Sequence, residues 1–142
     1  EEFLNTTKKL AGVKSPDVAT ALRGMAQIHH KWKNFDKAIL LYEQALHVGK
    51  AALGPNHEDV AITLNKLGNL LFQIGELDRA TVVYKEGLAI ERTTLDFLDN
   101  RIAVTLTNIA QVYNVSGKYQ EALRLLKEAV TIQRHHLGRS HP

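Results

Sequence analysis

The sequence repeats itself every 42 residues, and this period constrains the fold more than any other feature. Asp17-Val18-Ala19 recurs as Asp59-Val60-Ala61, and a further step of the same length reaches Arg101-Ile102-Ala103. Positions that keep one residue type in all three copies include Ala38, Ala80 and Ala122, and Leu22, Leu64 and Leu106. A fixed period of this length is typical of a solenoid, in which each unit buries its apolar face against its neighbours.

Each unit contains two helical patterns. In the second unit the apolar residues are three or four positions apart, so one helical face carries them all: Val60, Leu64, Leu67, Leu71 and Ile74. A break follows at Gly75-Glu76, and a second helix runs to about Leu95. Ser15-Pro16 is a helix start signal and Gly54-Pro55 a stop signal. No strand pattern competes, so we predict an all-α fold.

Small residues recur where two helices must approach closely. They are Ala26, Gly68 and Ala110 on the first helix of each unit, and Ala45, Gly87 and Ala129 on the second. Tyr42 and Tyr84 match each other in the repeat, and we expect both in the core.

These residues resemble the tetratricopeptide repeat. The second copy matches its signature with Leu64, Leu67-Gly68, Leu71, Ala80 and Tyr84, and the third with Leu106, Ile109-Ala110, Tyr113 and Ala122. The closing proline is replaced by Lys50, Arg92 and Arg134, which lengthens the unit. This long form is similar to the kinesin light chain and nephrocystin class. The resemblance implies a right-handed α-solenoid of stacked antiparallel helical hairpins, with about seven helices.

The repeat divides the chain into one continuous domain of successive units. Residues 1–14 align with 43–56, so we expect them to be the second helix of a preceding repeat. Three repeats follow, at 15–56, 57–98 and 99–142, the last including the lead-in to a following repeat. Neither end resembles a polar capping repeat, so end-to-end self-association is possible on this interpretation.

Composition excludes several classes of function. Hydrophobic residues make up 44% of the chain and charged residues 23%, as in an ordinary soluble protein. The formal charge of +3 comes from 18 basic and 15 acidic residues mixed along the sequence, which does not favour nucleic-acid binding. There is no cysteine, and no apolar run long enough to cross a membrane. We expect a cytoplasmic, intracellular protein without a cofactor.

The residues opposite the core stripe of the first helices are the candidates for a binding groove on the concave face. They are Arg23, Gln27, Lys31, Asn65, Lys66, Asn69, Gln73, Asn108, Gln111 and Asn114. Gln27, Asn69 and Gln111 occupy one position of the repeat, so each unit presents a carboxamide that can both donate and accept hydrogen bonds. Such a row suits the backbone of an extended peptide, and the basic residues favour an acidic one. The alternative is that the amides bond one another and hold the stack in register.

Several other features have structural explanations. Adjacent histidines such as His29-His30 point in different directions on a helix, and we expect no metal site. His57 and His141 hold equivalent lead-in positions, which indicates a repeated local contact. We expect Trp32 to fill a gap, and Phe97 and Leu98 to cover the second helices rather than to form a contact site. No catalytic motif is present.

The sequence therefore predicts a non-catalytic adaptor or scaffold that binds a short extended peptide of another protein. One alternative is a structural or self-associating spacer within a larger protein. Another is the regulatory array of an enzyme whose catalytic domain lies outside this segment.

Overall fold

Six α-helices account for nearly all of the chain that the computed structural model describes, which is residues 15–140. They are α2 (Pro16–Lys31), α3 (Phe35–Leu53), α4 (Glu58–Gln73), α5 (Leu77–Thr94), α6 (Asn100–Val115) and α7 (Tyr119–Ser140). This part of the chain contains no strand, and the all-α prediction is confirmed. The further helix expected at 1–14 and the lead-in histidine His141 lie outside the described residues.

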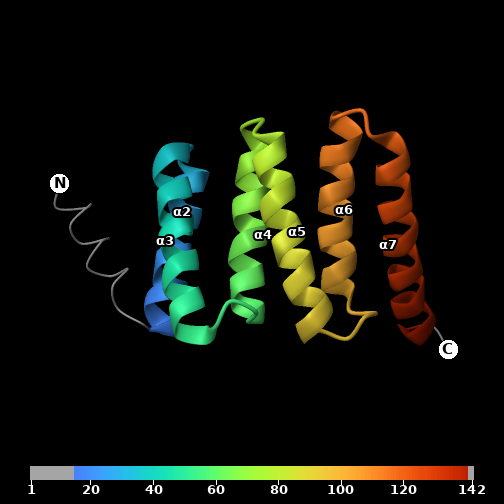
Figure 1. The fold of residues 1–142 in the computed structure, drawn as a ribbon, viewed down its shortest axis with the longest axis horizontal. Helices are drawn as coiled ribbons and strands as arrows, with labels where there is room; N and C mark the ends of the chain where they lie inside the picture. The colour runs from blue at the N-terminus through green and yellow to red at the C-terminus, as the bar shows by residue number, and fades with distance from the viewer. Residues whose placement is uncertain (1–14, 141–142) are drawn as a thin grey trace.

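The helices form three antiparallel hairpins stacked side by side along the long axis of the molecule (Figure 1). The pairs α2–α3, α4–α5 and α6–α7 form the hairpins, and α3 packs on α4 as α5 packs on α6. The first helices α4 and α6 also touch each other directly. Each unit is therefore held by the hairpins before and after it, as the periodicity predicts.

The turns inside the hairpins share one backbone geometry. Gly75 and Gly117 have φ angles of 85° and 81°, in the left-handed region where a side chain is disfavoured. Lys33 holds the equivalent position in the first hairpin and adopts the same conformation, with a φ of 63°. Gly54, at φ 93°, ends α3 as the Gly54-Pro55 signal predicts.

The core is built from close contacts between small and large residues. Gly68 lies against the ring of Tyr84, and a Cβ added to it would come within 2.6 Å of that ring. Both Tyr42 and Tyr84 are buried, as are the small residues expected at the helix contacts. The largest cluster of buried apolar residues draws on all three hairpins, from Leu22 of α2 to Val112 of α6.

Three sequence predictions of buried side chains need correction. Trp32 is 68% exposed at the end of α2, so it does not fill a gap. Of the two loop residues, Leu98 packs against the core of the third hairpin as predicted, but Phe97 is 74% exposed. Ile74 is also on the surface, because it follows the last residue of α4.

Candidate functional site

A hollow of about 470 Å³ lies between α2 and α4. More of the predicted groove residues line it than line any other hollow described below. We call it the α2–α4 groove. Its lining residues are Gln27, His30, Lys31, Lys33, Tyr42, Lys66, Asn69 and Gln73. Five of these were candidates from the sequence, and they meet because positions three or four apart on α2 and on α4 share a helical face.

The charge of the groove comes from three lysines. Lys31 lies near the end of α2, Lys33 in the turn that follows, and Lys66 faces them from α4. Among residues 15–140, no aspartate or glutamate lines the groove. The ammonium groups therefore create a positive field that an acidic ligand would meet without a competing carboxylate.

Two carboxamides in the groove already have protein partners. The Oε1 atom of Gln73 lies 2.6 Å from Nε2 of His30, which ties α4 to α2 across the groove. The Oδ1 atom of Asn69 accepts a hydrogen bond from the hydroxyl of Tyr84. Burial raises the pKa of Tyr84 to about 12, so the phenol keeps its proton and remains a donor at neutral pH. Asn69 is thus oriented by its own hairpin, and its NH₂ group stays available.

Arg23 and Asn65 do not line the groove, because each makes a contact between consecutive hairpins. Arg23 donates hydrogen bonds to the backbone oxygen of Asp59 and to Oγ1 of Thr63, at 3.2 and 3.1 Å. One repeat later, Asn65 donates to Oγ1 of Thr105 at 3.0 Å. The two contacts occupy the same positions of the repeat.

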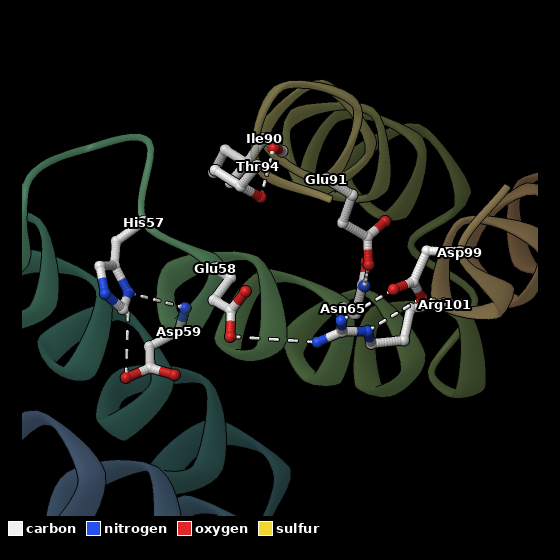
Figure 2. Close-up of polar contacts among 9 residues, drawn as sticks. All are labelled: His57, Glu58, Asp59, Asn65, Ile90, Glu91, Thr94, Asp99 and Arg101. Atoms are coloured by element: carbon white, nitrogen blue, oxygen red, sulfur yellow. Dashed lines mark hydrogen bonds and ion pairs between the residues drawn. The ribbon is translucent and has the colours of Figure 1, made fainter. Parts of the chain in front are cut away.

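Asn65 also belongs to a buried polar cluster at the second junction. Its Nδ2 lies 3.2 Å from a carboxylate oxygen of Glu91, which is 5% exposed. Figure 2 shows this pair beside Arg101, whose guanidinium is held by Asp99 at 2.9 Å and reaches Glu58 at 4.0 Å. Burial raises the pKa of Glu91, while the hydrogen bonds from Thr105 and Asn65 oppose that shift.

The remaining three candidates lie on α6, away from the α2–α4 groove. Gln111 and Asn114 line a second hollow of about 390 Å³, together with the apolar side chains of Tyr119, Leu123 and Leu126. Asn108 is half-buried and lines neither hollow. Nine of the ten candidates therefore separate into a basic amide groove, an apolar hollow and two junction contacts, and Asn108 belongs to none of them.

Sequence reasoning missed two groove residues, His30 and Lys33. His30 was set aside as half of a histidine pair. Lys33 occupies the position that Gly75 and Gly117 hold in the other two units, which by itself indicates a turn and not a binding residue. Their positions could have indicated the groove, because both residues lie within one helical turn of Lys31, which was a candidate and ends α2.

His57 makes a local contact at the start of α4, and the repetition of that contact predicted at His141 lies outside the described residues. The Nδ1 atom of His57 accepts a hydrogen bond from the backbone N–H of Asp59 at 3.0 Å and caps the helix. Asp99, one repeat later, caps α6 in the same way by accepting from Arg101 N–H. The position is therefore an N-cap in both units.

Within residues 15–140 no group of three or more His, Cys, Asp or Glu side chains is arranged to hold a metal ion. None of the helices in that range is long and apolar enough to cross a membrane.

Comparison with solved structures shows the same architecture in several proteins. BtubC (BKLC) from P. vanneervenii is 28% identical with a TM-score of 0.82, over 91% of this chain and 51% of that one. The TPR-like repeats of a kinesin light chain assigned to P. anserina are 22% identical with a TM-score of 0.76, over 92% and 62% of the two chains. The N-terminal domain of stress-induced protein-1 from C. elegans is 16% identical with a TM-score of 0.69, over 82% and 85%. The chain spans about half the length of BtubC.

Comparison of sequences identifies the repeat type. No curated protein sequence is a significant match to the chain. Two family models match it, both described as tetratricopeptide repeat, one over residues 17–93 and one over residues 102–142. Together with the fold, these matches show that the chain belongs to the tetratricopeptide repeat family.

Proposed function

We propose that this protein-interaction module binds a short, extended, acidic peptide of another protein in the α2–α4 groove. The observation that carries the proposal is the lining of that groove, where three lysines and three carboxamides gather without a carboxylate. In this proposal the units 15–56, 57–98 and 99–142 act as one continuous support, in a reducing compartment inside the cell. The function is non-catalytic.

The two kinds of side chain have different tasks. The carboxamides of Gln27, Asn69 and Gln73 offer donors and acceptors at successive turns, which match the N–H and C=O groups of an extended backbone. The ammonium groups of Lys31, Lys33 and Lys66 form charge-assisted hydrogen bonds with ligand carboxylates, which are stronger than bonds between neutral groups. Affinity for acidic side chains therefore depends on the lysines, and backbone recognition depends on the amides.

A second candidate is a structural spacer without a peptide ligand. The contacts of Arg23 with Thr63 and of Asn65 with Thr105 favour it, because they show polar groove-side residues holding hairpins in register. Those contacts explain two of the ten candidates and leave the lysines of the α2–α4 groove without a role. We therefore prefer peptide binding.

Two further possibilities from the sequence remain proposals of lower rank. An enzyme-regulatory role depends on a catalytic domain outside this chain. End-to-end self-association would bring α7 of one copy against α2 of the next, and the charges at that joint oppose it, as argued below.

The test is fluorescence polarisation of the chain with a labelled acidic peptide and a neutral peptide of the same length. The variant Lys31→Ala/Lys66→Ala should weaken binding of the acidic peptide about tenfold or more, since each lysine contributes a charge-assisted bond. Higher salt should weaken the wild-type binding in the same direction. Lys127→Ala/Arg134→Ala is the matched control, because it removes the same charge from α7 and should leave binding unchanged.

Gln27→Ala separates the peptide and spacer functions better than Asn69→Ala. Asn69 accepts the Tyr84 bond, so its loss lowers stability under either function. The side chain of Gln27 has no hydrogen-bond partner within residues 15–140. Peptide binding that weakens with an unchanged melting temperature supports the groove. Binding of neither peptide by the wild-type chain contradicts it.

A further inference from the structure

The helix α7 exposes an apolar face whose counterparts on α3 and α5 are covered. Leu126 is 38% exposed, whereas Tyr42 and Tyr84 at the same position of the repeat are 1% and 2% exposed. Leu123 and Val130 continue the stripe at helical spacing and are 54% and 42% exposed. On α3 and α5 this face is covered by the first helix of the next hairpin.

Ion pairs between consecutive second helices show which charges accompany this packing. Each pair joins residues that are 36 positions apart in the sequence. The pairs are Glu43 with Arg79 at 3.4 Å, Lys50 with Glu86 at 2.8 Å, and Arg92 with Glu128 at 2.9 Å. Two positions of the second helix, seven residues apart, therefore form the ion pairs with the next second helix. On α3 these positions are Glu43 and Lys50.

On α7 the same two positions are Lys127 and Arg134, and both are cationic and exposed. Neither side chain forms an ion pair within residues 15–140. At a further joint of the same geometry, each would face one residue on the second helix of the incoming hairpin. Complementary charge at that joint requires two carboxylates, seven residues apart.

A second copy of this chain does not supply those carboxylates. Stacked end to end in the same register, its first hairpin would place Lys37 opposite Lys127 and Gln44 opposite Arg134. Neither residue is a carboxylate, so the second copy lacks the complementary charges that Lys127 and Arg134 require. The third unit, in contrast, has Glu121 and Glu128 at these positions.

We infer that the outer face of α7 docks a helical hairpin of this same repeat type, whose second helix carries two carboxylates seven residues apart opposite Lys127 and Arg134. The apolar stripe of Leu123, Leu126 and Val130 receives the first helix of that hairpin. The two cations select the hairpin and reject a second copy of the chain. This inference concerns a different face from the α2–α4 groove and stands apart from the peptide ligand proposed above.

The test attaches hairpins directly after Pro142, in the register of the repeat. One extension repeats residues 101–140, which present Glu121 and Glu128 to α7. The other repeats residues 17–56, which have the same length and present Lys37 and Gln44, as a second copy would. In each extension the two facing residues are also exchanged: Glu121→Lys/Glu128→Gln in the first, and Lys37→Glu/Gln44→Glu in the second.

Within each extension, the version with two carboxylates should melt about 2–4 °C above its charge-exchanged partner, and 1 M salt should reduce the difference. Backbone amides of 123–130 should exchange more slowly with the acidic extension than without one. Lys127→Glu/Arg134→Glu in α7 should reverse the order of each pair.

Equal melting temperatures within both pairs would overturn the charge selection. Unchanged hydrogen exchange at 123–130 would overturn docking itself. Sedimentation of the unextended chain should show a monomer at all concentrations. If the chain instead associates, and Leu126→Asp abolishes that association, a second copy does dock on α7 and this part of the inference is wrong.

Discussion

The ammonium nitrogen of Lys50 lies 2.8 Å from the carboxylate of Glu86, and this contact joins the second helices of two consecutive hairpins. Arg92 and Glu128 make the same contact one repeat later, with the guanidinium bonding both carboxylate oxygens at 2.9 and 3.0 Å. Lys50 and Arg92 stand where the shorter form of the repeat has its closing proline. The longer second helix therefore places a cation within reach of the neighbouring unit.

A double-mutant cycle on Arg92 and Glu128 should give a small coupling energy. Both side chains are about two-fifths exposed, at 42% and 41%, so water screens the pair. We expect a coupling of about 0.5 kcal/mol, which should fall towards zero in 1 M salt. Chemical unfolding of wild type, Arg92→Ala, Glu128→Ala and the double variant measures it. A coupling above about 2 kcal/mol would mean that the pair is far less solvated than its exposure indicates.

The variant Gly68→Ala should destabilise the second hairpin. The added Cβ would lie 2.6 Å from the Tyr84 ring, which must then move and loosen its hydrogen bond to Asn69. The expected loss is about 1–2 kcal/mol, because the cost of overpacking exceeds the gain in helix propensity.

The third unit suggests how to rescue this variant. There Ala110 is paired with Leu126 in place of a tyrosine. Tyr84→Leu in the Gly68→Ala background should therefore recover part of the lost stability. If Gly68→Ala melts at the wild-type temperature, the contact is less tight than its geometry indicates.

Glu91→Gln should stabilise the chain at neutral pH. The carboxylate is 5% exposed, and its Oε1 atom and Oδ1 of Asn65 have no hydrogen-bond partner within the described residues. A neutral amide avoids burying the charge and supplies a donor, for a gain of about 1 kcal/mol. Thermal melting at pH 7 measures the gain, with the exposed Glu128→Gln as the control.

The same substitution should flatten the pH dependence of stability. Because the pKa of Glu91 is higher in the folded chain, the folded chain binds the proton more tightly than the unfolded one. The free energy of unfolding should fall as pH rises from about 4.3, the ordinary value, through the raised folded-state pKa. Glu91→Gln removes this decline. An equally steep decline in the variant would assign it to another group.

Repetition explains how much of the structure the sequence predicts. The 42-residue period determines the helix boundaries and the buried small residues, because one packing arrangement is used three times. Where the copies differ, side-chain placement is harder to predict. Helical spacing predicts Arg23 and Asn65 on the groove face, but each donates a hydrogen bond to a threonine on the next first helix and so lies in the junction. Trp32 is exposed because it lies one residue past the end of α2, where helical spacing no longer indicates a face.

Lys33→Gly should make the chain more stable and its groove less able to hold an acidic ligand. Lys33 has a φ of 63°, a conformation that costs a residue with a side chain about 1 kcal/mol, and its counterparts Gly75 and Gly117 avoid that cost. Lys33 also lines the α2–α4 groove, where its ammonium group adds positive charge. We expect unfolding to become less favourable by about 0.5–1 kcal/mol and the acidic peptide to bind several-fold more weakly. Gly117→Lys is the converse control, since it should lose similar stability without changing binding. If Lys33→Gly gains stability and binds the acidic peptide as tightly as wild type, the lysine has no role in the groove.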